Sequence, residues 1–164
     1  MTFLETTAQT SFTLSGQAPG STCTFRMFVT NVIGQGPYSS TLEVLFAVAP
    51  GEQTSAPEFV GRSGGDAEHD LAPYITIKWQ PPLDDGGADI LGYLVELDHT
   101  DDSASSWITV YDGSSQPHIL EFTFQDASII TAGQTYSFRT YSRNIAGLSG
   151  ASDTIEIMAA TVPA

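Results

Sequence analysis

The stretch GQTYSFRTYSRNIAG, residues 133–147, decides the fold of this chain. Apolar, aromatic or small side chains recur in it at every second position, starting with Tyr136 and Phe138. Successive side chains of a β-strand point to opposite faces, so this alternation is typical of a half-buried strand. The stretch predicts a strand over Thr135–Asn144 that ends in an Asn-x-x-Gly turn at Gly147.

This stretch is the second of two copies in the chain. Residues 20–34, GSTCTFRMFVTNVIG, align with residues 133–147 at a constant offset of 113 residues. The positions identical in both copies include Thr22, Phe25, Arg26, Asn31 and Gly34. A period of this length fits a sandwich domain with its connection, so the repeat indicates two domains.

The rest of the chain carries further short alternating runs, separated by Gly, Pro, Asp and Ser clusters, and no convincing amphipathic helix. This spacing predicts an all-β sandwich. The predicted strands besides Thr135–Asn144 are Ser11–Gly16, Thr22–Asn31, Thr41–Val48, Tyr74–Gln80, Ile90–Asp98, Trp107–Tyr111, His118–Phe124 and Asp153–Ala160.

The second copy resembles the fibronectin type III domain, a seven-stranded sandwich of the immunoglobulin-like class. The resemblance rests on Trp79 followed by two prolines, on the loop Asp84–Gly87 with the run Gly92–Glu96, and on residues 132–147. The sequence of the second copy is similar to the type found in giant muscle proteins such as titin. The resemblance places Tyr136 at the tyrosine corner, where its hydroxyl bonds back to the main chain. In the first copy Cys23 stands at that position.

The domain division that we predict is a C-terminal part of a fibronectin type III domain over residues 1–50, a linker over 51–56 and a complete domain over 57–164. The first part lacks three strands of the family, which would leave apolar side chains of its hairpin uncovered. These are Phe25, Met27, Val29, Val44 and Phe46. We expect the chain to be a segment of a longer tandem array. The alternative is that another chain donates the missing strands by β-augmentation.

The composition excludes several classes of function. Nineteen acidic residues against five basic ones give a formal charge of −14, which disfavours binding to nucleic acid or to anionic membrane surfaces. Sixteen of the nineteen acids follow Ser55. No apolar run is long enough to cross a membrane, and the single cysteine, Cys23, cannot form an internal disulfide. We interpret Cys23 as a buried small hydrophobe rather than a reactive thiol.

The chain shows no motif for catalysis, and we expect no enzyme activity, no cofactor and no metal. The weak metal candidates are Asp98, Asp101 and Asp102, beside His99. A second acidic group, Asp84, Asp85 and Asp89, lies a strand's length away, so the two groups cannot share an ion. Each is explained as a solvated loop, with turn chemistry at Asp85-Gly86-Gly87. The Asn-x-x-Gly patterns at Asn31 and Asn144 are likewise interpreted as turns.

One repeated feature predicts an interaction surface. Alternation directs a set of apolar side chains away from the core, and four of them form two pairs at the 113-residue offset. A rimmed apolar patch of this kind is a candidate protein interface, although β-propensity alone also explains it. The candidate residues are Phe28, Leu45, Leu94, Tyr141 and Met158, with Glu96, Arg139 and Arg143 as a rim.

These observations predict a noncatalytic structural and protein-interaction module of a tandem fibronectin type III protein at the cell surface or in an extracellular filament or matrix. Its partners would be other proteins or neighbouring modules, with assembly into a larger filament or complex and a role such as cell adhesion. One alternative is an intracellular cytoskeletal, ciliary or sarcomeric scaffold, which the titin-like wording favours. A third is an accessory module of a larger extracellular enzyme.

Overall fold

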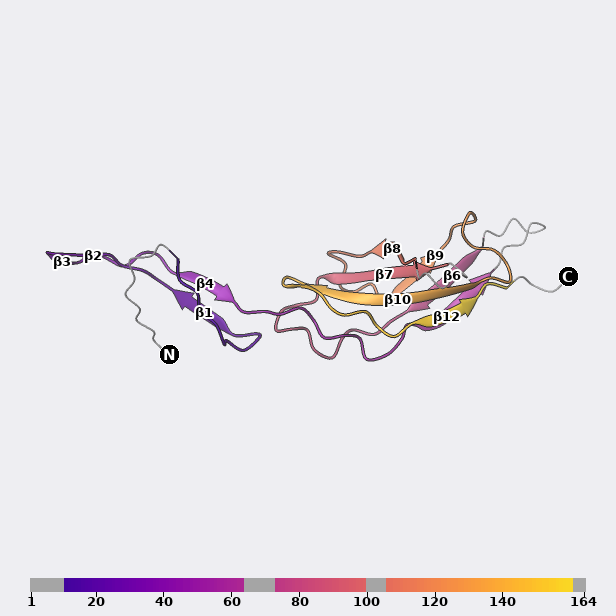
Figure 1. The fold of residues 1–164 in the computed structure, drawn as a ribbon, viewed down its shortest axis with the longest axis horizontal. Helices are drawn as coiled ribbons and strands as arrows, with labels where there is room; N and C mark the ends of the chain where they lie inside the picture. Colours follow the sequence, from indigo (N-terminus) through magenta and orange to yellow (C-terminus); the bar gives the residue numbers. More distant parts are fainter. Residues whose placement is uncertain (1–10, 64–72, 100–105, 161–164) are drawn as a thin grey trace.

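The computed structural model describes residues 11–63, 73–99 and 106–160, which form strands and no helix. The molecule is elongated, with hairpins at its N-terminal end and a β-sandwich at the other (Figure 1). The all-β class predicted from the alternation is therefore confirmed. Among the described residues, no helix is long and apolar enough to cross a membrane.

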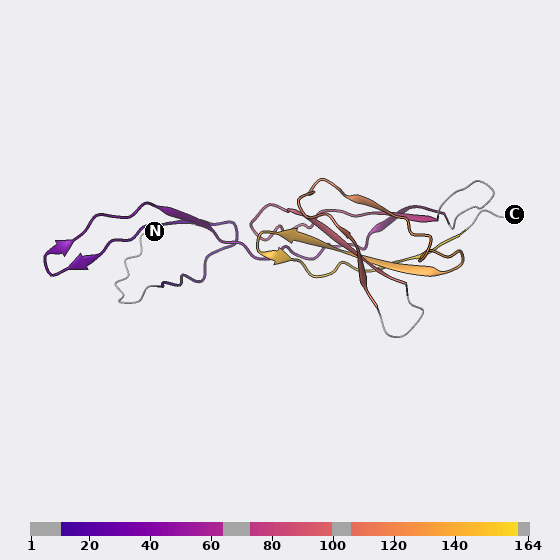
Figure 2. The same cartoon turned by 90° about the horizontal axis from the view of Figure 1, so that it is seen from above.

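In the described residues, the N-terminal hairpins pair two strands at any point. Strand β1 (Thr22–Phe25) pairs with β4 (Leu42–Leu45), and further along the same ribbon β2 (Thr30–Asn31) pairs with β3 (Gly34–Gln35). The predicted strand over 22–31 is thus divided, and residues 11–16 form no strand. Figure 2 shows the ribbon extending away from the sandwich.

The face of this ribbon that we expected to point into a core has no facing sheet among the described residues. Met27 is 69% exposed and Val29 is 75% exposed. This agrees with the exposure expected of a module that lacks three strands of the family. Phe25, Val44 and Phe46 are half-buried. Two strands alone cannot cover their own apolar side chains, because a sandwich core needs a second layer.

The first sheet of the sandwich has the order β5-β6-β9. It consists of β5 (Glu58–Ser63), β6 (Tyr74–Lys78) and β9 (Glu121–Phe124), all antiparallel. Strand β5 was not predicted from the sequence. A register shift between Phe59 and Gly61 breaks the alternation by which strands are recognised.

The second sheet contains the strand that decided the fold. Strand β10 (Thr135–Asn144), whose bounds match the prediction, lies between β7 (Gly92–Asp98) on one side and both β11 (Gly147–Leu148) and β12 (Ile155–Met158) on the other. Strand β8 (Ile108–Asp112) extends the sheet beyond β7.

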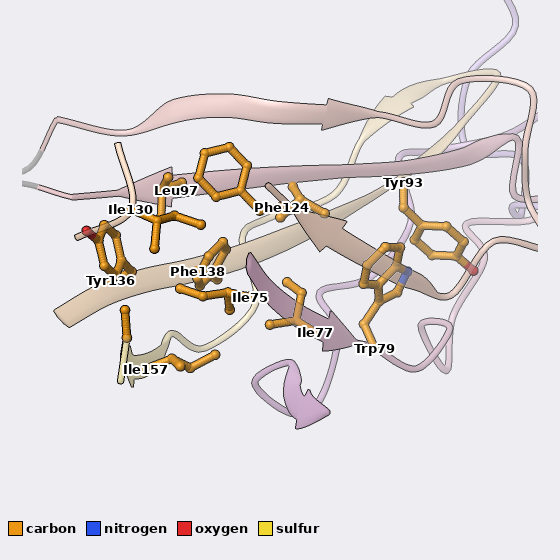
Figure 3. Packing of buried hydrophobic residues seen from close by; sticks show 12 residues of the cluster. Ile75, Ile77, Trp79, Tyr93, Leu97, Phe124, Ile130, Tyr136, Phe138 and Ile157 are labelled. Carbon is orange, nitrogen blue, oxygen red and sulfur yellow. The ribbon is translucent and has the colours of Figure 1, made fainter. Parts of the chain in front are cut away.

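The core lies between the two sheets of the sandwich. Tyr136, Phe138, Thr140 and Ser142 of β10 are buried in it, and Trp79, which follows β6 of the first sheet, is buried on the facing side. The alternation predicts that Tyr93 and Val95 also face β10 from the opposite side, but both lie on β7, in the same sheet as β10. Figure 3 shows the packing, with Trp79 and Tyr93 together at one end. The core cluster comprises Ile75, Ile77, Trp79, Tyr93, Val95, Leu97, Phe124, Ile130, Tyr136, Phe138, Ile157 and Ala159.

Candidate interaction face

The outward face of the second sheet presents a row of long polar and aromatic side chains. On β10 the odd-numbered residues point outward, and the register places Arg139 opposite Glu96 and Tyr141 opposite Leu94 of β7. Trp107 lies immediately before β8, beside the same face. The alternation that fills the core with Phe138 and Thr140 therefore also builds this face.

Arg139 and Glu96 form the centre of this face. The Nε and Nη2 atoms of Arg139 lie 2.8 and 2.7 Å from the same carboxylate oxygen, Oε2 of Glu96. Their side chains are only 26% and 19% exposed, so this pair is less screened by water than an ordinary surface ion pair. The Tyr141 hydroxyl donates a third hydrogen bond to that oxygen at 2.9 Å.

Aromatic rings enclose the Arg139 guanidinium. Its central carbon lies 4.0 Å from the centroid of the Trp107 ring and 5.6 Å from that of Tyr141. A guanidinium over an indole face gains cation–π attraction while its N–H groups remain paired with Glu96. The result is a preorganised surface of aromatic rings and one ion pair. We call Leu94, Glu96, Trp107, Arg139 and Tyr141 the aromatic–arginine face.

The electrostatics of this face follow from these contacts. Burial, and then the hydrogen bond to Glu96, raise the pKa of Tyr141, so its hydroxyl stays protonated and donates. Further along β10, Arg143 lies 3.8 Å from the Asp112 carboxylate and also contacts the Ser114 hydroxyl. The Ser114 hydroxyl and amide bonds lower the pKa of Asp112, and Arg143 contributes less.

The structure brings only part of the predicted face together. Leu94 and Tyr141 are neighbours in register, but Met158 lies opposite Thr135, six residues along β10 from Tyr141 and hence about 20 Å away. Met158 is 55% exposed and lies apart from the aromatic–arginine face.

The same separation holds in the first copy. Leu45 lies opposite Thr22, six residues before Phe28. The Phe28 ring packs edge-on against Tyr38 at 5.3 Å, and Arg26 covers the Tyr38 ring at 3.9 Å. In each copy, therefore, the aromatic residue of the predicted surface lies far from the aliphatic residue: Phe28 from Leu45, and Tyr141 from Met158.

Trp107 was not predicted from the sequence to belong to this face. It was assigned to a strand but not to a surface, because the cross-strand contact with Arg139 depends on the pairing of β7 with β8. A register shift between Val95 and Glu96 in that pairing is not visible in the sequence.

The acidic loop Asp84–Gly87 is a turn. The Asp84 and Asp85 carboxylates accept hydrogen bonds from the amides of Gly86 and Gly87 at 2.9 and 2.8 Å. Asp98 lies on β7, and the other two weak metal candidates, Asp101 and Asp102, lie outside the described residues. Within the ranges that the structure describes, no group of three or more potential metal ligands gathers.

Cys23 and Asn31 show what the first copy retains. Cys23 is half-buried, with Sγ 3.8 Å from the side-chain oxygen of Gln17, so it makes a local contact where Tyr136 makes the corner. The Asn31 side-chain oxygen accepts from the amides of Ile33 and Gly34 at 2.9 and 3.2 Å, which confirms the turn.

Comparison with known proteins agrees with this architecture. No protein-family model matches the chain. A mouse protein, fibronectin type III domain containing protein 3C1, is 32% identical over 141 residues, which are 85% of this chain and 9% of that protein. The chain is a fibronectin type III domain protein.

Other relatives of this fibronectin type III chain are named for myosin. Chicken cardiac-type myosin-binding protein C is 37% identical over 75 residues, covering 46% of this chain and 5% of that protein. Human myosin-binding protein H is 37% identical over 73 residues, covering 44% of this chain and 14% of that protein. The chain thus spans a small fraction of the curated relatives it matches.

Solved structures share the fibronectin type III fold of this chain. Domains A168–A170 of titin superpose with a TM-score of 0.60 at 22% identity, covering 79% of this chain and 38% of that one. The sixth fibronectin type III domain of a human fibronectin type III domain containing protein 3 gives 0.53 at 16% identity, covering 73% and 93%. At these identities the likeness concerns the fold alone.

Proposed function

We propose that this chain is a noncatalytic structural module that binds other proteins through the aromatic–arginine face, within a larger tandem fibronectin type III protein. The observation that carries the proposal is the ordered stack of Trp107, Arg139 and Tyr141 around Glu96 on the outer surface of a sheet. Aromatic residues and arginine are enriched at the centres of protein interfaces, where they contribute most of the binding energy.

The fixed geometry of this face also favours binding. The Arg139 and Tyr141 side chains are already held by Glu96, so they give up little side-chain freedom when a partner covers them. The face presents two aromatic rings and the Leu94 side chain without an isolated charge, since Arg139 and Glu96 neutralise each other. A partner of complementary, mostly apolar surface with a polar rim fits it best.

The proposed setting is an intracellular filament or cytoskeletal scaffold. The support is that several relatives carry names that describe binding to myosin. The cell-surface setting, the adhesion role and the accessory role beside an extracellular enzyme gain no support from the named relatives. We also propose the division into an incomplete module up to residue 50, a linker over 51–56 and a complete module over 57–164.

Co-sedimentation with purified myosin filaments tests this function. We expect the chain to pellet with filaments, and we expect the double variant Trp107→Ser, Tyr141→Ser to weaken binding at least tenfold, because it removes both rings of the face. The matched control is Lys78→Ser, which breaks the exposed ion pair with Glu58, 3.0 Å apart, on the other sheet. That control should bind like the original chain.

The design separates binding from folding. Near-ultraviolet circular dichroism reports the buried Trp79 and Tyr93 pair, so it shows whether the double variant keeps its core. A folded double variant that still pellets with filaments would refute the role of the face. Absence of filament binding by the original chain would refute the myosin-filament setting.

A further inference from the structure

The connection between the hairpins and the sandwich is bound along its length by two loops of the sandwich. Residues 48–51 run past the loop Asp84–Gly87 and past the turn that follows β10. The Val48 amide donates to the Gly86 carbonyl at 2.9 Å, and the Gly51 amide donates to the Asp84 carbonyl at 2.9 Å. These bonds hold the connection as if it were an added strand.

Asn144 completes this contact from the other side. Its side-chain amide nitrogen lies 2.7 Å from the Val48 carbonyl and 2.7 Å from the Asp85 carbonyl, so one residue joins the connection to the loop. Its side-chain oxygen accepts from the amides of Ala146 and Gly147 at 2.8 and 3.1 Å. Asn144 is only 3% exposed, and this hydrogen bonding satisfies its amide group.

Two glycines allow the backbones to approach this closely. Gly86 and Gly87 have φ angles of 72° and 80°, a region that side-chain-bearing residues rarely adopt. A Cβ atom on Gly86 would collide with the Val48 carbonyl oxygen, and one on Gly87 would collide with the Gly20 amide of the hairpin turn. The Asp84 and Asp85 carboxylates fix the loop by accepting from the two glycine amides.

The repeat contains an internal comparison for Asn144. Asn31 occupies the equivalent position in the first copy and makes the same two turn bonds through its side-chain oxygen. It is exposed, and the hydrogen bonds found for its side chain among the described residues are those turn bonds alone. The turn therefore does not need the hydrogen bonds that the Asn144 side-chain nitrogen donates to the Val48 and Asp85 carbonyls. Those bonds hold the connection.

We propose that this pole of the sandwich is a docking site for the extended main chain of an incoming connection, and that Asn144 locks the connection so that the two parts keep one orientation. The site contacts the backbone N–H and C=O groups of Val48 and the amide of Gly51 rather than any large side chain. The ligand chemistry is an extended segment of small residues ending in Pro-Gly, as in Val48–Gly51.

The variant Asn144→Asp tests the lock. An Asp oxygen still accepts from Ala146 and Gly147, but the donor that faced two carbonyls becomes an acceptor. We expect amide hydrogen exchange of Val48 and Gly51 to become at least tenfold faster, and NMR relaxation to show the two parts tumbling separately. Asn31→Asp is the matched control, and it should leave both measurements unchanged.

A second variant approaches the same site from the loop. Gly86→Ala forces the loop away from the Val48 carbonyl without changing β10, and it should loosen the connection in the same way. The thermal unfolding midpoint of the sandwich is measured in parallel. The proposal is wrong if Asn144→Asp leaves the exchange of Val48 unchanged, if Asn31→Asp has the same effect, or if loosening occurs only when the sandwich itself unfolds.

Discussion

The hydroxyl of Tyr136 lies 2.8 Å from the carbonyl oxygen of Ile129, to which it donates, and 2.7 Å from the amide of Thr131, from which it accepts. Tyr136 is 1% exposed, so this hydroxyl joins the entry of β10 to the preceding turn inside the protein. The corner fixes where β10 begins and hence which of its side chains face the core.

Tyr136→Phe should lower the free energy of unfolding of the sandwich by about 1–3 kcal/mol, because it removes both of the partly buried hydrogen bonds that the hydroxyl makes with the Ile129 carbonyl and the Thr131 amide. Urea denaturation followed by tryptophan fluorescence measures the change. Tyr74→Phe is the control, since that ring is half-buried on β6 and its hydroxyl lies outside the corner. Equal losses in both variants would contradict the role of the corner.

Phe138→Ala should destabilise the sandwich by about 3–5 kcal/mol, the usual cost of removing a fully buried aromatic ring. Phe25→Ala, at the equivalent position of the first copy, should cost far less, because Phe25 is only half-buried on a two-stranded ribbon. Calorimetry of the two variants compares the unfolding transitions. A similar loss at Phe25 would show that the ribbon has a core of its own.

Arg139→Lys should lower the free energy of unfolding by about 1 kcal/mol, because a lysine cannot reproduce the paired Nε and Nη2 contacts with Glu96 or the stacking on Trp107. Chemical denaturation measures it. Arg143→Lys is the control, since its ion pair with Asp112 is long, at 3.8 Å, and exposed, and should change stability little. The reverse order would refute the central position of Arg139.

Asp112 should contribute to stability only while it is ionised. Its hydrogen bonds from Ser114 lower its pKa below the ordinary 3.8, so its contribution is present above that value and is lost as the pH falls through the lowered pKa. Ser114→Ala should move the Asp112 titration, followed by NMR, back toward higher pH. An unchanged titration would show that Ser114 does not hold the carboxylate.

Features that depend on neighbouring residues in the chain could be predicted from the sequence, whereas contacts between distant segments could not. Strand β10 was predicted with its observed bounds because its alternation is uninterrupted, and the Tyr136 corner followed from its position in the motif. Strand β5 was missed because a bulge breaks its alternation. Asn144 was recognised as a turn residue, but its bonds to Val48 and Asp85 join segments far apart in the chain.

The interaction face shows the same limit. Leu94 was predicted to share the outer face with Tyr141, and their register brings them together. Met158 was expected beside Tyr141 because their strands are adjacent in the family topology, yet position along a strand also decides contact. Trp107 entered only when the pairing of β7 with β8 placed it beside Arg139.

The bound connection at Val48 has a consequence for longer assemblies. Where successive modules meet through a junction of fixed geometry, each step repeats one rotation and one translation, so the series follows a helical path with a defined pitch. If such junctions opened, the series would behave as a flexible chain whose mean span grows only with the square root of its length. The hydrogen bond of the Asn144 amide would then decide whether a series of modules is rigid or flexible.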